Sequence, residues 1–122
     1  MRFFKCELCG KIIGEIKGGS PQTICCGEPM KELVANTSDG ATEKHVPVIT
    51  TNGNQIEVVV GEVEHPMLPE HYIEWIALET KQGMQRKALN PGDAPKAVFA
   101  IADGDEVVAA YAYCNLHGLW KK

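Results

Sequence analysis

Residues 46–60 read VPVITTNGNQIEVVV, and this stretch decides the fold class. Two runs rich in β-branched residues, 46–50 and 55–60, lie on either side of Asn52-Gly53. Asparagine and glycine both tolerate positive φ, so an Asn-Gly pair between two such runs predicts a tight β-hairpin. The centre of the chain is therefore expected to be antiparallel β-structure.

Further short runs of the same composition follow, at residues 72–78, 84–89, 97–102 and 106–113. Turn signals separate these runs: Gln82-Gly83, Asn90-Pro91-Gly92 and Asp103-Gly104. The Asp-Gly pair predicts a second hairpin for the same reason as the Asn-Gly pair. No segment keeps the 3.6-residue apolar period of a helix. The pattern predicts a mainly β fold, with a β-sandwich in residues 37–122.

The first 36 residues differ from the rest in composition. They hold five Lys and Arg against four Glu, whereas residues 37–122 hold seven Lys and Arg against twelve Asp and Glu. A piece this short buries too little apolar surface to fold without a covalent or metal staple. We expect residues 1–36 to form a small metal-binding N-terminal domain and residues 37–122 to form a second domain.

Composition excludes several classes of protein. The chain has 122 residues, of which 44% are apolar, so it can form a core. Its net charge of −4 argues against nucleic acid as a partner. It has no apolar run of the ~20 residues that a membrane span needs, and no apolar signal segment near Met1. Five cysteines without a secretory signal predict a reducing, cytoplasmic location.

Four of the five cysteines form one group, Cys6-x-x-Cys9 followed by Cys25-Cys26. Four thiolates suit a tetrahedral zinc or iron ion. A zinc ribbon or a pair of disulfides is the alternative. The side chains of adjacent residues diverge, so Cys25 and Cys26 can reach one ion only if the backbone bends sharply between them. The residues alone leave the choice between zinc and iron open.

A second group of potential metal ligands lies in the remaining sequence: His45, His65, His71, Cys114 and His117. Each histidine is near a predicted strand end or a proline, where the loops of a sandwich cluster. A single histidine is more often a surface residue than a ligand, but this set includes every histidine of the chain. Four imidazoles and one thiolate suit iron or copper, and five ligands leave one octahedral position open.

The chain resembles the desulfoferrodoxin family, the two-iron superoxide reductases, over essentially its whole length. The resemblance rests on the cysteine group and on four segments: EKHVP at 43–47, HPM at 65–67, HYIEWI at 71–76 and CNLHG at 114–118. It implies a desulforedoxin-like domain with one iron in the four cysteines. It also implies an immunoglobulin-like sandwich with a second iron, which His45, His65, His71 and His117 bind equatorially and Cys114 axially.

The resemblance further implies an activity, the one-electron reduction of superoxide to hydrogen peroxide with electrons from an external donor such as rubredoxin. Lys44 is expected to attract the anion, and Glu43 resembles a residue that fills the open iron position in the oxidised resting state. A homodimer is expected as well. The alternative is a non-enzymatic iron or zinc protein that transfers electrons or binds metal. Superoxide dismutation is disfavoured because a thiolate-ligated iron is too electron-rich to oxidise superoxide.

Overall fold

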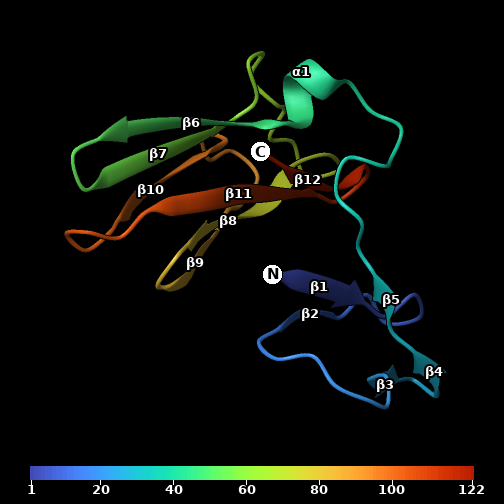
Figure 1. Cartoon of the computed structure of the whole chain (residues 1–122). Coiled ribbons are helices and arrows are strands. Elements are labelled where there is room, and N and C mark those ends of the chain that lie inside the picture. The colour runs from blue at the N-terminus through green and yellow to red at the C-terminus, as the bar shows by residue number, and fades with distance from the viewer. The chain divides into compact units, whose positions relative to one another are not determined.

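The computed structural model describes residues 1–122 and divides the chain into two compact units, Met1–Val34 and Ala35–Lys122 (Figure 1). The first unit contains only short strands. They are β1 (Arg2–Lys5), β2 (Ile12–Glu15), β3 (Ile24–Cys25), β4 (Glu28–Pro29) and β5 (Lys31–Glu32). Strands β2, β1 and β5 form one antiparallel sheet, and β3 and β4 form a separate hairpin. Only Phe3, Cys6 and Met30 are buried in this unit, so its apolar core is minimal.

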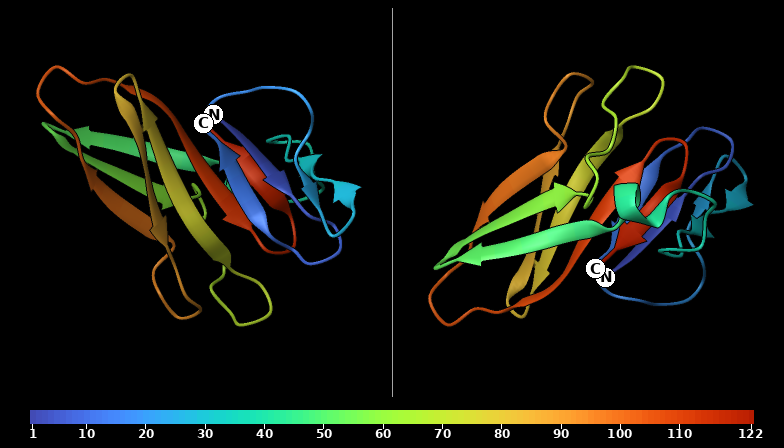
Figure 2. Two further views of the ribbon diagram at one scale, coloured as in Figure 1. Left: turned by 90° about the horizontal axis from the view of Figure 1, so that it is seen from below. Right: turned by 90° about the horizontal axis from the view of Figure 1, so that it is seen from above.

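The second unit is a two-layered antiparallel sandwich preceded by one helical turn, α1 (Thr42–His45). Its strands are β6 (Pro47–Asn52), β7 (Gln55–Val60), β8 (Ile73–Thr80), β9 (Gly83–Ala88), β10 (Lys96–Ala100), β11 (Val107–Cys114) and β12 (Gly118–Lys121). One sheet has the order β10-β7-β6 and the other β12-β11-β8-β9. Figure 2 shows β6 and β7 side by side and joined at one tip, as the Asn52-Gly53 pair predicts. No helix in the structure is long and apolar enough to cross a membrane.

Alternating residues of facing strands form the sandwich core. Ile56, Val58 and Val60 of β7 are fully buried, and so are Ile76 and Leu78 of β8. Burial of each such side chain contributes about 1.5–3 kcal/mol. Cys114, the last residue of β11, belongs to the same cluster and has no exposed surface. One proposed metal ligand is therefore part of the rigid core of the sandwich.

The structure confirms the mainly β fold and all six predicted strands of the second unit, but it corrects three details. The Asp103-Gly104 hairpin is wrong, because β10 pairs with β7 and β11 pairs with β8, so this turn crosses between the sheets. An Asp-Gly pair predicts only that the chain reverses its direction. Which strands then pair depends on which strand edges are free. The sequence analysis also missed β12 and α1, which are too short to show a period.

Candidate metal centres

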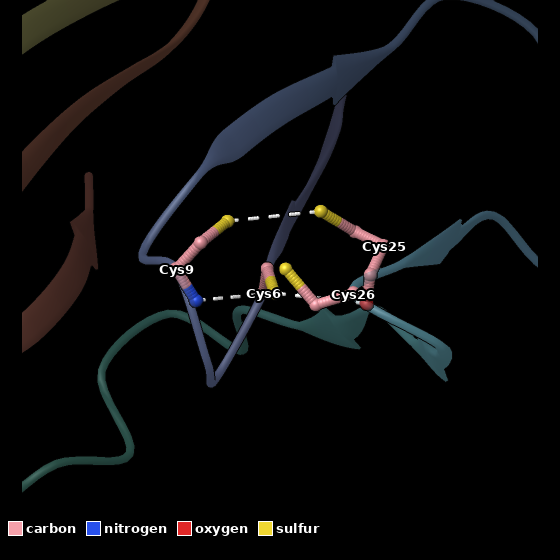
Figure 3. A group of neighbouring side chains, drawn as sticks. All are labelled: Cys6, Cys9, Cys25 and Cys26. Atoms are coloured by element: carbon pink, nitrogen blue, oxygen red, sulfur yellow. Dashed lines mark hydrogen bonds between the residues drawn. The ribbon is translucent and has the colours of Figure 1, made fainter.

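The four cysteines of the first unit converge on one point (Figure 3). Cys6 follows β1, Cys9 lies in the next turn, Cys25 ends β3, and Cys26 begins the turn to β4. Their Sγ atoms all lie within 4.8 Å of one another. Cys26 has φ 53° and Gly27 has φ 79°, so both residues of the β3–β4 turn have left-handed backbone. This is the sharp bend that adjacent cysteine ligands require.

The distances and charges in this group fit a bound cation. The Cys9 and Cys25 Sγ atoms are 3.7 Å apart, close to the ~3.8 Å edge of a tetrahedron of sulfurs at ~2.3 Å from an ion. The Cys9 backbone N–H donates to the Cys6 sulfur and lowers the pKa of Cys6 to about 6. The sulfurs of Cys9 and Cys6 raise the pKa of Cys25 to about 12. Without a cation, the group cannot hold four thiolates.

The histidines and the fifth cysteine meet at one end of the sandwich. His45 ends α1 immediately before β6, His65 lies in the loop after β7, and His71 precedes β8. Cys114 ends β11, and His117 lies in the turn to β12. Antiparallel pairing brings these strand starts and ends together. Ligand atoms of His45, His65, His71 and Cys114 lie within 4.8 Å of one another, and His117 Nδ1 is 3.0 Å from His45 Nε2.

Backbone carbonyls fix which ring nitrogen points at the centre of this group. His45 Nδ1–H donates to the Ala41 carbonyl and His65 Nδ1–H to the Pro66 carbonyl, each at 2.7 Å. Burial lowers the pKa of His45 and lowers that of His65 to about 4, so both rings are neutral at pH 7. Their Nε2 atoms therefore carry lone pairs, and these atoms face each other at 3.1 Å. Two lone pairs at this distance repel unless a cation lies beside them.

Two more observations fit a metal at this centre. His71 Nε2 is buried and has no hydrogen-bond partner, which is costly for a polar atom unless an ion binds it. Nitrogens about 2.1 Å from one ion and at right angles to each other lie about 3.0 Å apart. His45 Nε2 lies 3.0 Å from His117 Nδ1 and 3.1 Å from His65 Nε2, which fits this geometry.

We expect the Cys114 side chain to be a thiolate only when a cation lies beside it. Burial raises the pKa of Cys114, whereas the backbone N–H groups of His117 and Leu116 donate toward its sulfur and lower it. Neutral imidazoles with one thiolate suit iron or copper, and four thiolates suit zinc or iron. The donor sets are thus consistent with two metal ions in each chain.

Family models match both units of the chain. The family model described as Desulfoferrodoxin matches residues 37–122, and the one described as Desulfoferrodoxin, N-terminal domain matches residues 1–33. The chain belongs to the desulfoferrodoxin family. The two donor groups of this desulfoferrodoxin-family chain are consistent with two irons, one in each unit.

Individual relatives agree with this assignment. The chain is 52% identical to the desulfoferrodoxin of Nitratidesulfovibrio vulgaris over 97% of this chain and 92% of the relative. It is 48% identical to a desulfoferrodoxin homolog of Archaeoglobus fulgidus, over 99% and 95% of the two chains. A crystal structure of the superoxide reductase from Treponema pallidum has a TM-score of 0.83 at 39% identity and covers 98% of both chains. Both units of the desulfoferrodoxin-family chain are therefore present in its relatives.

Glu43 and Lys44 lie exposed on α1, next to His45. The Lys44 ammonium is near enough to contribute to the lowered pKa values of His45 and His71, for which burial is the largest cause. No hydrogen bond or ion pair joins the Glu43 carboxylate to the histidines, although its carbonyl accepts from the Val63 N–H at 2.8 Å. The positive charge of Lys44 therefore acts on the His45 and His71 rings.

The sequence analysis missed residues that surround the histidines. Trp120 stacks on the His45 ring with centroids 4.8 Å apart, and its Nε1–H donates to the His117 carbonyl at 3.0 Å. A Cβ at Gly40 would lie 3.2 Å from the His45 ring and 3.3 Å from the His117 ring. Trp120 is three residues after His117, so its place beside the rings could have been inferred from the sequence. No local pattern links Gly40 to the rings.

Proposed function

We propose that this chain is a superoxide reductase, which catalyses O₂•⁻ + e⁻ + 2 H⁺ → H₂O₂. The observation that carries the proposal is the convergence of four histidines and one cysteine at one end of the sandwich. The names of the structural relatives support the same activity. Cys114 supports reduction over dismutation, because a thiolate donor makes a metal electron-rich.

The ligands we assign to the catalytic iron are His45, His65, His71, His117 and Cys114. The ligands we assign to the second iron are Cys6, Cys9, Cys25 and Cys26. When bound, the catalytic iron supplies the electron and an open position at which superoxide is reduced. The backbone N–H groups of Leu116 and His117 withdraw charge from the Cys114 sulfur and so set how strongly it donates.

Lys44 has the role of steering the substrate. The chain carries net charge −4, and superoxide is an anion, so the overall field opposes their encounter. The exposed ammonium of Lys44 provides a local positive charge beside His45 and His71. It can also hold a water molecule that donates protons to the developing peroxide. We assign Glu43 the role of a carboxylate that would occupy the open position in the oxidised resting state.

The donor, the assembly and the location are also part of the proposal. A small redox protein such as rubredoxin is the proposed electron donor, and a homodimer is the proposed assembly. A reducing, cytoplasmic compartment is the proposed location, because the proposed metal sites need all five cysteines as thiolates.

The test is rapid mixing of the reduced, iron-loaded protein with pulse-generated superoxide, followed by assay of peroxide and oxygen. We expect one peroxide for each superoxide consumed and no release of oxygen. A yield of half a peroxide with oxygen release would identify a dismutase instead. Superoxide decay at the rate of buffer alone would favour the non-enzymatic alternative. The visible spectrum separates iron from zinc, because only an iron–thiolate centre is coloured.

A further inference from the structure

Asn115 lies between Cys114 and His117 but is not itself a candidate metal ligand. Its side chain joins two segments that are far apart in sequence. Asn115 Nδ2–H donates to the Glu70 carbonyl at 3.0 Å, and Asn115 Oδ1 accepts from the Tyr72 N–H at 2.9 Å. The Asn115 backbone N–H donates to the Tyr72 carbonyl at 3.2 Å. These three hydrogen bonds bracket His71 from both sides.

The bonds form where regular strand pairing ends. Tyr113 pairs with Trp75, but Cys114 pairs with Ile73, so the register of β11 and β8 shifts by one residue at this point. Such a bulge weakens the ladder of backbone hydrogen bonds. The hydrogen bonds of Asn115 replace the missing backbone contacts just beyond the bulge, at the segment that leads into β8.

His71, which is half-buried, needs this support more than the two buried histidines do. His45 and His65 each anchor Nδ1 to a backbone carbonyl at 2.7 Å. The buried Nε2 of His71 has no hydrogen-bond partner. Its backbone is held only by a two-bond bridge to Leu68, at 3.0 and 3.1 Å. The direction of the His71 ring therefore depends on how firmly residues 70 and 72 are held.

We propose that Asn115 is the positioning residue for His71, and that it joins the turn bearing Cys114 and His117 to the segment bearing His71. The proposal rests on the proposed iron site but not on its activity. Loss of the Asn115 amide should loosen His71 and weaken iron binding at the histidine centre alone. Loss of an outer partner of a metal ligand lowers metal affinity by about 10- to 100-fold.

The experiment compares Asn115→Ala and Asn115→Asp with wild type in two measurements. In the metal-free protein, Asn115→Ala should make the Tyr72 amide exchange its hydrogen at least about fivefold faster. In the iron-loaded protein, chelator competition should show that iron binds about 10- to 100-fold more weakly at the histidine centre. Iron affinity at the cysteine centre should not change. Asn115→Asp keeps the acceptor for Tyr72 and loses the donor to Glu70, so Tyr72 should stay protected while iron affinity falls less.

The matched control is Asn36→Gly. Asn36 also bonds one backbone N–H and one carbonyl, both of Lys121, at 2.9 and 3.1 Å, and its φ of 62° suits glycine. This variant should lose similar stability but keep wild-type iron affinity. Wild-type Tyr72 exchange and iron affinity in Asn115→Ala would overturn the proposal, and so would equal losses in Asn36→Gly. A wild-type protein that binds iron but does not reduce superoxide would refute the proposed function only.

Discussion

The two metal centres differ in what holds their ligands in place. The cysteine centre lies in a unit with three buried residues, and two of its four ligands, Cys9 and Cys26, are exposed. The histidine centre lies at the end of a sandwich, and His45, His65 and Cys114 are at most 2% exposed. In the first centre the ligands are close in sequence, on turns that have little other support. In the second they come from five places in a fold that has its own core.

The cysteine centre is therefore a metal-built site, which forms only when its ion binds. The histidine centre is a fold-built site, whose ligands the sandwich holds in place. Units below about 40 residues rarely fold without a metal or disulfide. The sandwich places its ligand atoms through strand pairing and carbonyl bonds that need no ion. The first centre thus suits metal-dependent folding, and the second suits chemistry with ligands fixed in advance.

Removal of both irons gives the largest expected effect. A chelator under reducing conditions should unfold residues 1–34, because metal binding supplies most of the folding free energy of such a unit, about 10–16 kcal/mol in zinc-finger peptides. The sandwich should remain folded on its apolar core. Amide NMR would report both units, and fluorescence of Trp75 and Trp120, the only tryptophans, would report the sandwich alone. If both units stayed folded in the metal-free protein, the first unit would not depend on its metal for folding, and this difference between the two centres would be disproved.

Cys114→Ser should abolish activity without unfolding the sandwich. An alcohol donates far less charge than a thiolate, so we expect superoxide reduction to fall by at least about a thousandfold, or about 4 kcal/mol. The visible sulfur-to-iron band of the oxidised centre should disappear as well. Absorption spectra and rapid mixing check both effects. An unchanged band would show that this sulfur is not a ligand.

The same contrast explains how far the sequence could predict these sites. The need for a bent backbone at Cys25-Cys26 followed from adjacency alone, and the left-handed φ values of Cys26 and Gly27 confirm it. The grouping of the histidines followed from predicted strand ends. The choice of ring nitrogen did not, because it depends on the carbonyls of Ala41 and Pro66. The positions of those carbonyls relative to the rings are set only when the loops fold.

Acidification should weaken the metal-free sandwich. Burial lowers the pKa of His45 and His71 and lowers that of His65 to about 4. The unfolded chain, with histidine pKa near 6.5, then binds more protons than the folded one, so stability falls as pH drops from ~6.5 toward 4. Urea unfolding followed by tryptophan fluorescence across this window measures the slope. His65→Asn, which keeps a donor for the Pro66 carbonyl, should flatten it.

Lys44→Ala should lower the rate constant with superoxide by about tenfold, a barrier change of ~1.4 kcal/mol. The ammonium attracts the anion over the ~8–10 Å range of screening at moderate salt, so the variant should also lose the decline of rate with ionic strength. Lys81→Ala is the control, since Lys81 pairs with Glu106 at the opposite end of β8. Equal rates and equal salt slopes in wild type and Lys44→Ala would exclude steering by Lys44.

Cys9→Ser should have the smallest effect on activity. The variant loses one of four sulfurs from a centre that depends on its metal, so the spectrum of the cysteine iron should vanish and residues 1–34 should lose order. The superoxide rate should stay within about twofold of wild type, because the two donor sets share no residue and belong to separate compact units. The measurement is a single turnover of the prereduced protein, which needs no electron from the first centre. If the rate falls with the spectrum while tryptophan fluorescence stays that of a folded sandwich, the two centres are coupled, and the fold-built site depends on the metal-built one.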